Sequence, residues 1–155
     1  MSEKFFDISI PLDFHGQQPN AFGAESAVAM TLGDTREGSS VNFERYSFSP
    51  HCSGTHTECI GHITRERISV RSCLDDVIVP AILVTIEPET DASEAYAAKM
   101  SGDRLITAGR LQGTIDALNA DHKSILKGGA LIVRTLPNSS DKISAKYDDT
   151  NVPGY

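Results

Sequence analysis

A nearly continuous apolar run, rich in β-branched residues, extends from Val77 to Ile86 and constrains the fold more than any other stretch. Such a run predicts a β-strand that is covered on both faces, with Pro80 near its start. A second apolar run, ALIVRT at residues 130–135, follows a Lys-Gly-Gly sequence and predicts another buried strand. We therefore expect a sheet that contains both segments.

Helical segments are interposed between these strands. The segment 106–122, ITAGRLQGTIDALNADH, predicts a helix with Thr107 as its N-cap. Its inner stripe is expected to contain Leu111, Ile115 and Leu118. The segment 90–100, TDASEAYAAKM, predicts a shorter helix. Strands with interposed helices indicate an α/β fold with a mixed sheet flanked by helices, and 155 residues suit a single domain, 1–155.

The first fifty residues contain three more candidate elements. KFFDISIPL at 4–12 alternates apolar and polar residues and predicts a first strand that stops at Pro11. VNFERYSFSP at 41–50 predicts a strand that runs into a histidine cluster. The segment 24–40, AESAVAMTLGDTREGSS, fits either a strand or a short helix and ends in a polar Gly/Ser loop.

Composition excludes several classes of protein. A net charge of −7, without clustered Lys and Arg, argues against nucleic acid as a partner. No apolar run approaches the length of a membrane span, and the N-terminus lacks the features of a secretory signal, so we expect a soluble cytoplasmic protein without a membrane partner. The three cysteines, Cys52, Cys59 and Cys73, do not make a disulfide framework, and a reducing compartment would keep them as thiols.

The stretch HCSGTHTECIGHI, residues 51–63, holds three of the five histidines, two of the three cysteines and one glutamate. It begins at the end of the strand predicted over 41–50, and strand ends commonly present active-site groups. Its four candidate ligands are separated by 5, 2 and 4 residues: His51, His56, Glu58 and His62. Three imidazoles and a carboxylate suit Zn²⁺ or Mn²⁺, and such a mixed shell often leaves a position open for water. This pattern favours a catalytic metal.

Two other interpretations of the cluster stay open. Cys52 and Cys59, with two of the histidines, would make a closed structural zinc site, although they lack the close Cys-x-x-Cys spacing of such sites. Alternatively, the cluster is a set of polar residues in a surface loop. We place the remaining histidines outside the site, His15 as a solvated loop residue and His122 as a residue at a helix end.

The motif HCSGTHTECIGH at 51–62 resembles the signature of the cyclase family of metal-dependent hydrolases, which is usually written H-x-G-T-H-x-D-x-P-x-H. This family includes bacterial kynurenine formamidases and isatin hydrolases. DISIPL at 7–12 resembles the family's opening strand, and both DRLIT at 103–107 and ALIVRT fit its first half. The resemblance covers most of the chain and implies the family's swivelling β/β/α fold.

The resemblance also implies an activity. His51 and His56 would be metal ligands, Glu58 would take the place of the usual aspartate, and His62 would be a second-metal ligand or the catalytic acid/base. Family members hydrolyse amides, commonly an N-formyl group or a strained ring amide, with a metal-activated water. We thus expect an amidohydrolase that acts on non-peptide carbon-nitrogen bonds of a small molecule, with Zn or Mn, as a homodimer.

Family members continue beyond the position of PGY at 153–155 and there supply a further histidine and a glutamate to the metal site, whereas no histidine follows His122. The resemblance therefore implies either the N-terminal portion of a longer chain or a shortened relative. An alternative function follows from this, namely a non-catalytic relative that serves as a binding or assembly subunit.

Overall fold

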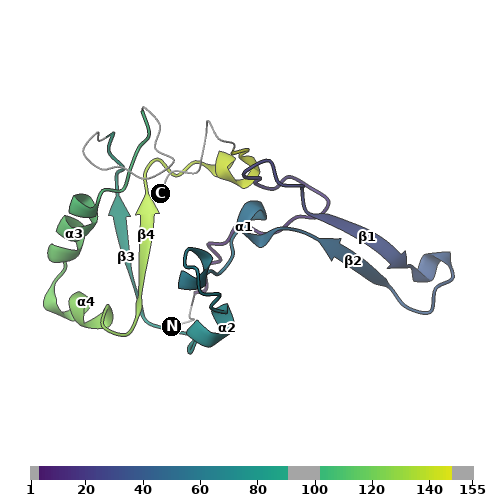
Figure 1. The fold of residues 1–155 in the computed structure, drawn as a ribbon, viewed down its shortest axis with the longest axis horizontal. Coiled ribbons are helices and arrows are strands. Elements are labelled where there is room, and N and C mark those ends of the chain that lie inside the picture. The colour runs from purple at the N-terminus through teal and green to yellow at the C-terminus, as the bar shows by residue number, and fades with distance from the viewer. Residues whose placement is uncertain (1–3, 91–101, 148–155) are drawn as a thin grey trace. The chain divides into compact units, whose positions relative to one another are not determined.

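The computed structural model describes residues 4–90 and 102–147 (Figure 1). These residues form two compact units, the first of residues 4–57 and 140–147 and the second of residues 58–90 and 102–139. Each unit contains one two-stranded sheet, antiparallel in the first and parallel in the second. The predicted α/β class is confirmed, with two small sheets in the described residues where a single sheet was expected.

An antiparallel ribbon of strands β1 (Val28–Gly33) and β2 (Phe43–Ser47) forms the sheet of the first unit. The connection between the strands contains the 3-10 turn η1 (Thr35–Glu37), which is capped by the preceding aspartate and closed by a left-handed glycine. The strand predicted over 41–50 is confirmed. The ambiguous segment 24–40 is a strand followed by this turn.

The strand predicted over residues 4–12 is wrong, because these residues belong to no helix or strand. A strand needs a neighbour that pairs with its backbone N–H and C=O groups. This segment pairs with a loop residue, Thr55, instead. Thr55 N–H donates to Ile10 O at 3.1 Å, and Ile10 N–H donates to Thr55 Oγ1 at 2.7 Å. The segment is thus joined to the loop that carries the histidine cluster.

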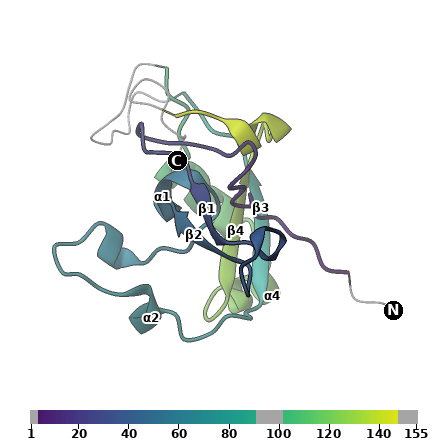
Figure 2. The ribbon, with the colours of Figure 1, turned by 90° about the vertical axis from the view of Figure 1, so that its right-hand side faces the viewer.

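Strands β3 (Ala81–Ile86) and β4 (Ala130–Thr135) form the parallel sheet of the second unit and lie side by side in both views (Figures 1 and 2). Both segments were predicted as strands from their apolar runs, and both strands are confirmed. The predicted burial of the second is wrong for the described residues, because every residue of β4 is half-buried or exposed. Parallel neighbours need a long crossover connection. Helices α3 (Ala108–Asp116) and α4 (Ala120–Ile125) lie in this connection and contact β3.

One face of β3 forms the core of the second unit. Its buried residues alternate along the strand: Ile82, Val84 and Ile86. Partly buried side chains from the crossover and from β4 pack against them: Ile106, Leu111, Leu118, Ile125, Leu126 and Leu131. Leu83, on the opposite face, is 55% exposed. The prediction that β3 is covered on both faces is wrong for the described residues, because their helices pack on one face alone.

The helix predicted over 106–122 is two helices. Its N-cap is confirmed, because Thr107 Oγ1 accepts a hydrogen bond of 3.2 Å from the backbone N–H of the third residue of α3. Asn119 then acts as a second N-cap, since its Oδ1 accepts the His122 N–H at 2.8 Å and starts α4. Short polar side chains of this kind compete with helix continuation for backbone hydrogen bonds. His122 consequently lies within α4.

Two expectations from the sequence can be compared with the structure only within the described residues. The helix predicted over 90–100 falls almost wholly on residues 91–101, which lie outside them. Among residues 4–90 and 102–147, no helix combines the length and the apolar composition needed to cross a bilayer. The last element described is the 3-10 helix η3 (Ser140–Ser144), which belongs to the first unit.

The core of β3 can be tested with two matched substitutions. Ile86 is 2% exposed and Ile78 is 92% exposed. We expect Ile86→Ala to lower the free energy of unfolding by about 2–5 kcal/mol, because it opens a cavity beside Val84 and Ile82. Ile78→Ala should change it by less than about 0.5 kcal/mol. Urea unfolding followed by circular dichroism measures both values, and equal effects would contradict the assigned core.

Candidate metal centre

The histidine cluster starts where β2 ends. Helix α1 (Pro50–Ser53) begins three residues after the last residue of this strand, with proline at its first position, where a missing N–H is tolerated. Gly54 ends the helix after one turn. An extended connection leads from there to the 3-10 turn η2 (Ile60–His62). His51 therefore lies on a helical turn, whereas His56 belongs to the extended connection.

Gly54 and Thr55 fix the path of the chain between these elements. A Cβ atom at Gly54 would lie 3.0 Å from the carbonyl oxygen of Ile10, so the close approach of the two chain segments favours glycine there. The paired hydrogen bonds between Thr55 and Ile10 hold the next residue against the same segment. On either side of this held segment, the side chains of His51 and His56 approach to 3.3 Å.

His51, His56 and Glu58 each offer one ligand atom, and these three atoms lie within 4.8 Å of one another. The two imidazoles are close neighbours, with 3.3 Å between His51 Nδ1 and His56 Nε2. His51 is half-buried, while His56 and Glu58 are exposed. Two imidazole nitrogens and a carboxylate oxygen make a donor set that suits a divalent transition metal. The three residues thus fit the metal predicted from the sequence, although their role as ligands stays a prediction.

A backbone hydrogen bond orients His56 for such a role. Its Nδ1 lies 2.8 Å from the carbonyl oxygen of Gly54. Because a carbonyl oxygen can only accept, Nδ1 must donate its proton, and in the neutral imidazole Nε2 then carries the lone pair. That nitrogen is the one that faces His51. An imidazole held by its second nitrogen in this way is the usual arrangement of a histidine that binds a metal.

His51 is in contact with an aromatic residue on its other side. The rings of Phe22 and His51 are stacked, with 6.0 Å between their centroids and 3° between their planes. Phe22 has φ of 56°, a left-handed conformation that costs a non-glycine residue about 1–3 kcal/mol. Its backbone N–H donates to Tyr147 O at 3.1 Å, which helps to hold it there. Phe22 lies in a turn-rich stretch of the sequence, and no other pattern there points to a role for it.

A cavity of about 200 Å³ adjoins the cluster within the first unit. Its wall includes His51, Cys52, Ile10, Lys142 and Tyr147. The wall therefore combines apolar surface with one cationic side chain, directly beside a candidate ligand. Small organic molecules bind in sites of this mixed composition.

His62 is not part of the group of three. Its Nδ1 lies 3.8 Å from Glu58 Oε1, and the two residues are four positions apart. Both side chains are more than a third exposed. The structure thus pairs His62 with the candidate carboxylate ligand, which leaves both of its predicted roles open.

The alternative site with thiolate ligands is not formed in the described residues. Among residues 4–90 and 102–147, the group of side chains that could hold a metal ion consists of His51, His56 and Glu58 and contains no cysteine. The Cys59 thiol donates instead to Ile68 O at 3.2 Å. Cys52 and Cys59 are both half-buried free thiols.

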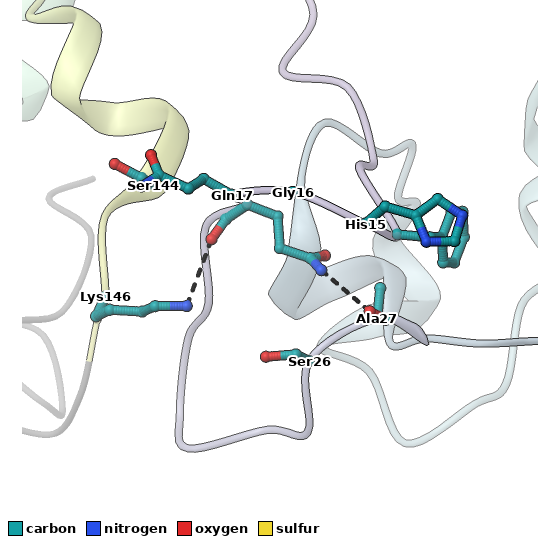
Figure 3. Close-up of a pocket in the computed structure, with 9 residues that line it drawn as sticks. His15, Gly16, Gln17, Ser26, Ala27, Ser144 and Lys146 are labelled. Carbon is teal, nitrogen blue, oxygen red and sulfur yellow. Dashed lines mark hydrogen bonds between the residues drawn. The ribbon is translucent and has the colours of Figure 1, made fainter. Parts of the chain in front are cut away.

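A second cavity of the first unit, of about 450 Å³, involves none of the cluster residues (Figure 3). Gln18 lines it, and its Nε2 donates to Ala27 O at 3.2 Å, while Lys146 Nζ donates to Gln18 O at 3.5 Å. Gln18 Oε1 is buried without a hydrogen-bond partner among the described residues. His15 lies on this wall, so the structure places it apart from the candidate ligands, as the sequence predicts.

Almost the whole chain matches the model of a known protein family. Residues 6–155 match the model of the Cyclase family, whose description is "Putative cyclase". No curated protein and no solved structure matches the chain. The family match includes all of the candidate ligands and agrees with the motif at residues 51–62.

Metal binding can be tested with one histidine inside the cluster and one outside it. We expect the protein to bind Zn²⁺ stoichiometrically and His56→Ala to weaken this binding by at least about tenfold, because it removes the oriented nitrogen. His122→Ala, which makes the same change within α4, should bind Zn²⁺ as the unmodified chain does. Isothermal titration calorimetry measures the affinities. Equal affinity in the two variants would show that the cluster is not the site.

Proposed function

The chain belongs to the cyclase family, as the match over residues 6–155 shows, and on this premise we propose that it hydrolyses a small amide with the help of a divalent metal. The bond would be an N-formyl amide or a strained ring amide. Family membership supports an enzyme, and the reaction class is our inference. The single observation that carries the inference is the oriented His56 imidazole beside His51 and Glu58.

We assign Zn²⁺ or Mn²⁺ to the three residues because of their donor atoms. Bound there, the cation would polarise the amide carbonyl and lower the pKa of a water molecule toward neutrality. His51 and His56 would hold it through Nδ1 and Nε2, the two nitrogens that lie 3.3 Å apart. Glu58 would supply negative charge and so offset part of the charge of the cation.

His62 is our candidate for proton transfer. Hydrolysis of an amide requires a proton to leave the attacking water and another to reach the departing nitrogen, and a histidine can carry out both steps. The Glu58 carboxylate lies 3.8 Å from His62 Nδ1. It favours the orientation of the imidazole in which Nδ1 faces the carboxylate and Nε2 points away from it. His62 is 46% exposed at its side chain, so a substrate can reach it.

The cavity beside His51 supports a small substrate. Its volume of about 200 Å³ is below the usual range for drug-sized ligands. Lys142 lines it and would favour a substrate that carries a negative charge or a carbonyl oxygen near the amide. The homodimer and the cytoplasmic location expected from the sequence remain predictions.

The test is a hydrolysis assay on N-formyl amides and cyclic amides with metal-loaded protein. We expect cleavage of at least one substrate class, loss of activity after chelation and recovery with Zn²⁺ or Mn²⁺. His62→Gln should lower kcat by at least about 100-fold without preventing metal binding, because it removes the proton carrier. His122→Gln is the matched control and should leave kcat unchanged.

Three results would contradict parts of this proposal. Activity that survives complete metal removal would overturn the metal-dependent reaction. Full activity of His62→Gln would overturn the role of His62. Stoichiometric metal binding without hydrolysis of either class would favour the alternative function, a non-catalytic binding or assembly subunit.

A further inference from the structure

Phe22 occupies a position in a turn that disfavours its residue type. The Ala24 backbone N–H donates to Ala21 O at 3.1 Å, which closes a four-residue turn. The two central residues of this turn both have positive φ, 56° at Phe22 and 63° at Gly23. Turns with this backbone favour asparagine, aspartate and glycine at their centre, because a bulky side chain is strained there. Strained residues cluster at functional sites and persist where the surrounding structure holds them.

Backbone hydrogen bonds hold the strained turn in place. Phe22 N–H donates to Tyr147 O at 3.1 Å, and Tyr147 N–H donates to Asn20 O at 2.8 Å. The Asn20 side chain braces the turn as well, since its Nδ2 donates to Ala24 O at 2.7 Å. None of these bonds involves the ring of Phe22, so the backbone can make them with another residue at this position. They account for the turn but not for the choice of phenylalanine.

The ring of Phe22 contacts the imidazole of His51. The two rings lie within 3° of parallel, with 6.0 Å between their centroids. This is an offset stack, which aromatic rings prefer to a direct face-to-face contact. Phe22 is 48% exposed, so packing in a core does not account for the phenylalanine either. The contact with a candidate metal ligand is the feature that remains.

The stack restrains the plane of the His51 imidazole. The last torsion of a histidine side chain has broad minima, so the plane of the ring is set largely by its neighbours. The lone pair of an imidazole nitrogen lies in the ring plane, and this plane therefore decides where a cation can bind. The rings of His51 and His56 are inclined at 80° to each other. Two planes at this angle meet along a single line, and a cation held by both nitrogens must lie close to it.

We propose that Phe22 is a positioning residue of the candidate metal centre, whose ring holds the His51 imidazole in the plane in which Nδ1 faces His56 Nε2. His56 is oriented by its hydrogen bond with Gly54 O, and the stack gives His51 a restraint of a different kind. The strained backbone at Phe22 is the cost of placing a ring at this point. The inference rests on the metal site of the proposed function and concerns the affinity of that site.

Zinc affinity of the whole chain, measured by isothermal titration calorimetry, tests this role. Phe22→Asn removes the ring and introduces a residue that accepts a left-handed backbone. We expect at least about a tenfold loss of zinc affinity. The midpoint of urea unfolding should stay unchanged or rise, because relief of the strain offsets the lost contact of a half-exposed ring. Phe22→Tyr keeps the ring and should restore the affinity. A merely structural residue would lose stability and affinity together.

Phe14→Leu is the matched control. Phe14 belongs to the same unit and contacts Tyr46, with 4.7 Å between the ring centroids. We expect this change to lower the midpoint of urea unfolding and to leave zinc affinity unaltered. Unchanged zinc affinity in Phe22→Asn would overturn the proposal. An equal loss of affinity in Phe14→Leu would also overturn it, because the effect would then follow from reduced stability.

Nuclear magnetic resonance of the metal-free protein separates this inference from the proposed function. We expect nuclear Overhauser effects between the rings of Phe22 and His51 and between those of His51 and His56, the second of which should weaken in Phe22→Asn. The same result in a protein that does not bind zinc would overturn the proposed metal site and leave the positioning of His51 established. Zinc binding without an effect between Phe22 and His51 would overturn the positioning role and leave the metal site established.

Discussion

The hydrogen bond from His56 Nδ1 to the Gly54 carbonyl oxygen is the interaction on which the account of this site depends. It decides which imidazole nitrogen carries the lone pair and directs that nitrogen toward His51. The bond joins residues two positions apart, and Thr55, which lies between them, is held in place by its pairing with Ile10. A loop segment is thereby given the fixed geometry that a metal site needs.

The candidate ligands could be predicted from the sequence because their proximity is local. Eight consecutive residues include His51, His56 and Glu58, so no distant segment of the chain is needed to bring them together. The groups that support them are distant in sequence. The segment around Ile10 that pairs with Thr55, and the Phe22 ring that stacks on His51, are contributed by a stretch whose pattern indicated only a strand and a turn. Contacts between residues so far apart leave no periodic pattern in the amino-acid sequence.

The fold shows the same division between local and distant determinants. The apolar runs that became β3 and β4 predict strands from their own composition. The Thr107 hydroxyl likewise caps α3 through a hydrogen bond to a residue three positions further along the chain. Alternation at residues 4–12 also suits a strand, yet a strand exists only where another strand is available to pair with it, and the segment bonds to Thr55 instead. Burial of β3 on one face likewise depends on where α3 and α4 pack, which its own sequence does not determine.

The most direct test of the central claim is X-ray absorption at the zinc edge, on the protein loaded with one equivalent of Zn²⁺. The account predicts imidazole nitrogen and carboxylate oxygen at about 2.0–2.2 Å without sulfur, and loss of imidazole scattering in His56→Ala. A shell with sulfur at about 2.3 Å would instead identify a thiolate site built on Cys52 or Cys59. That result would contradict the role of the oriented His56 imidazole and, with it, the proposed reaction.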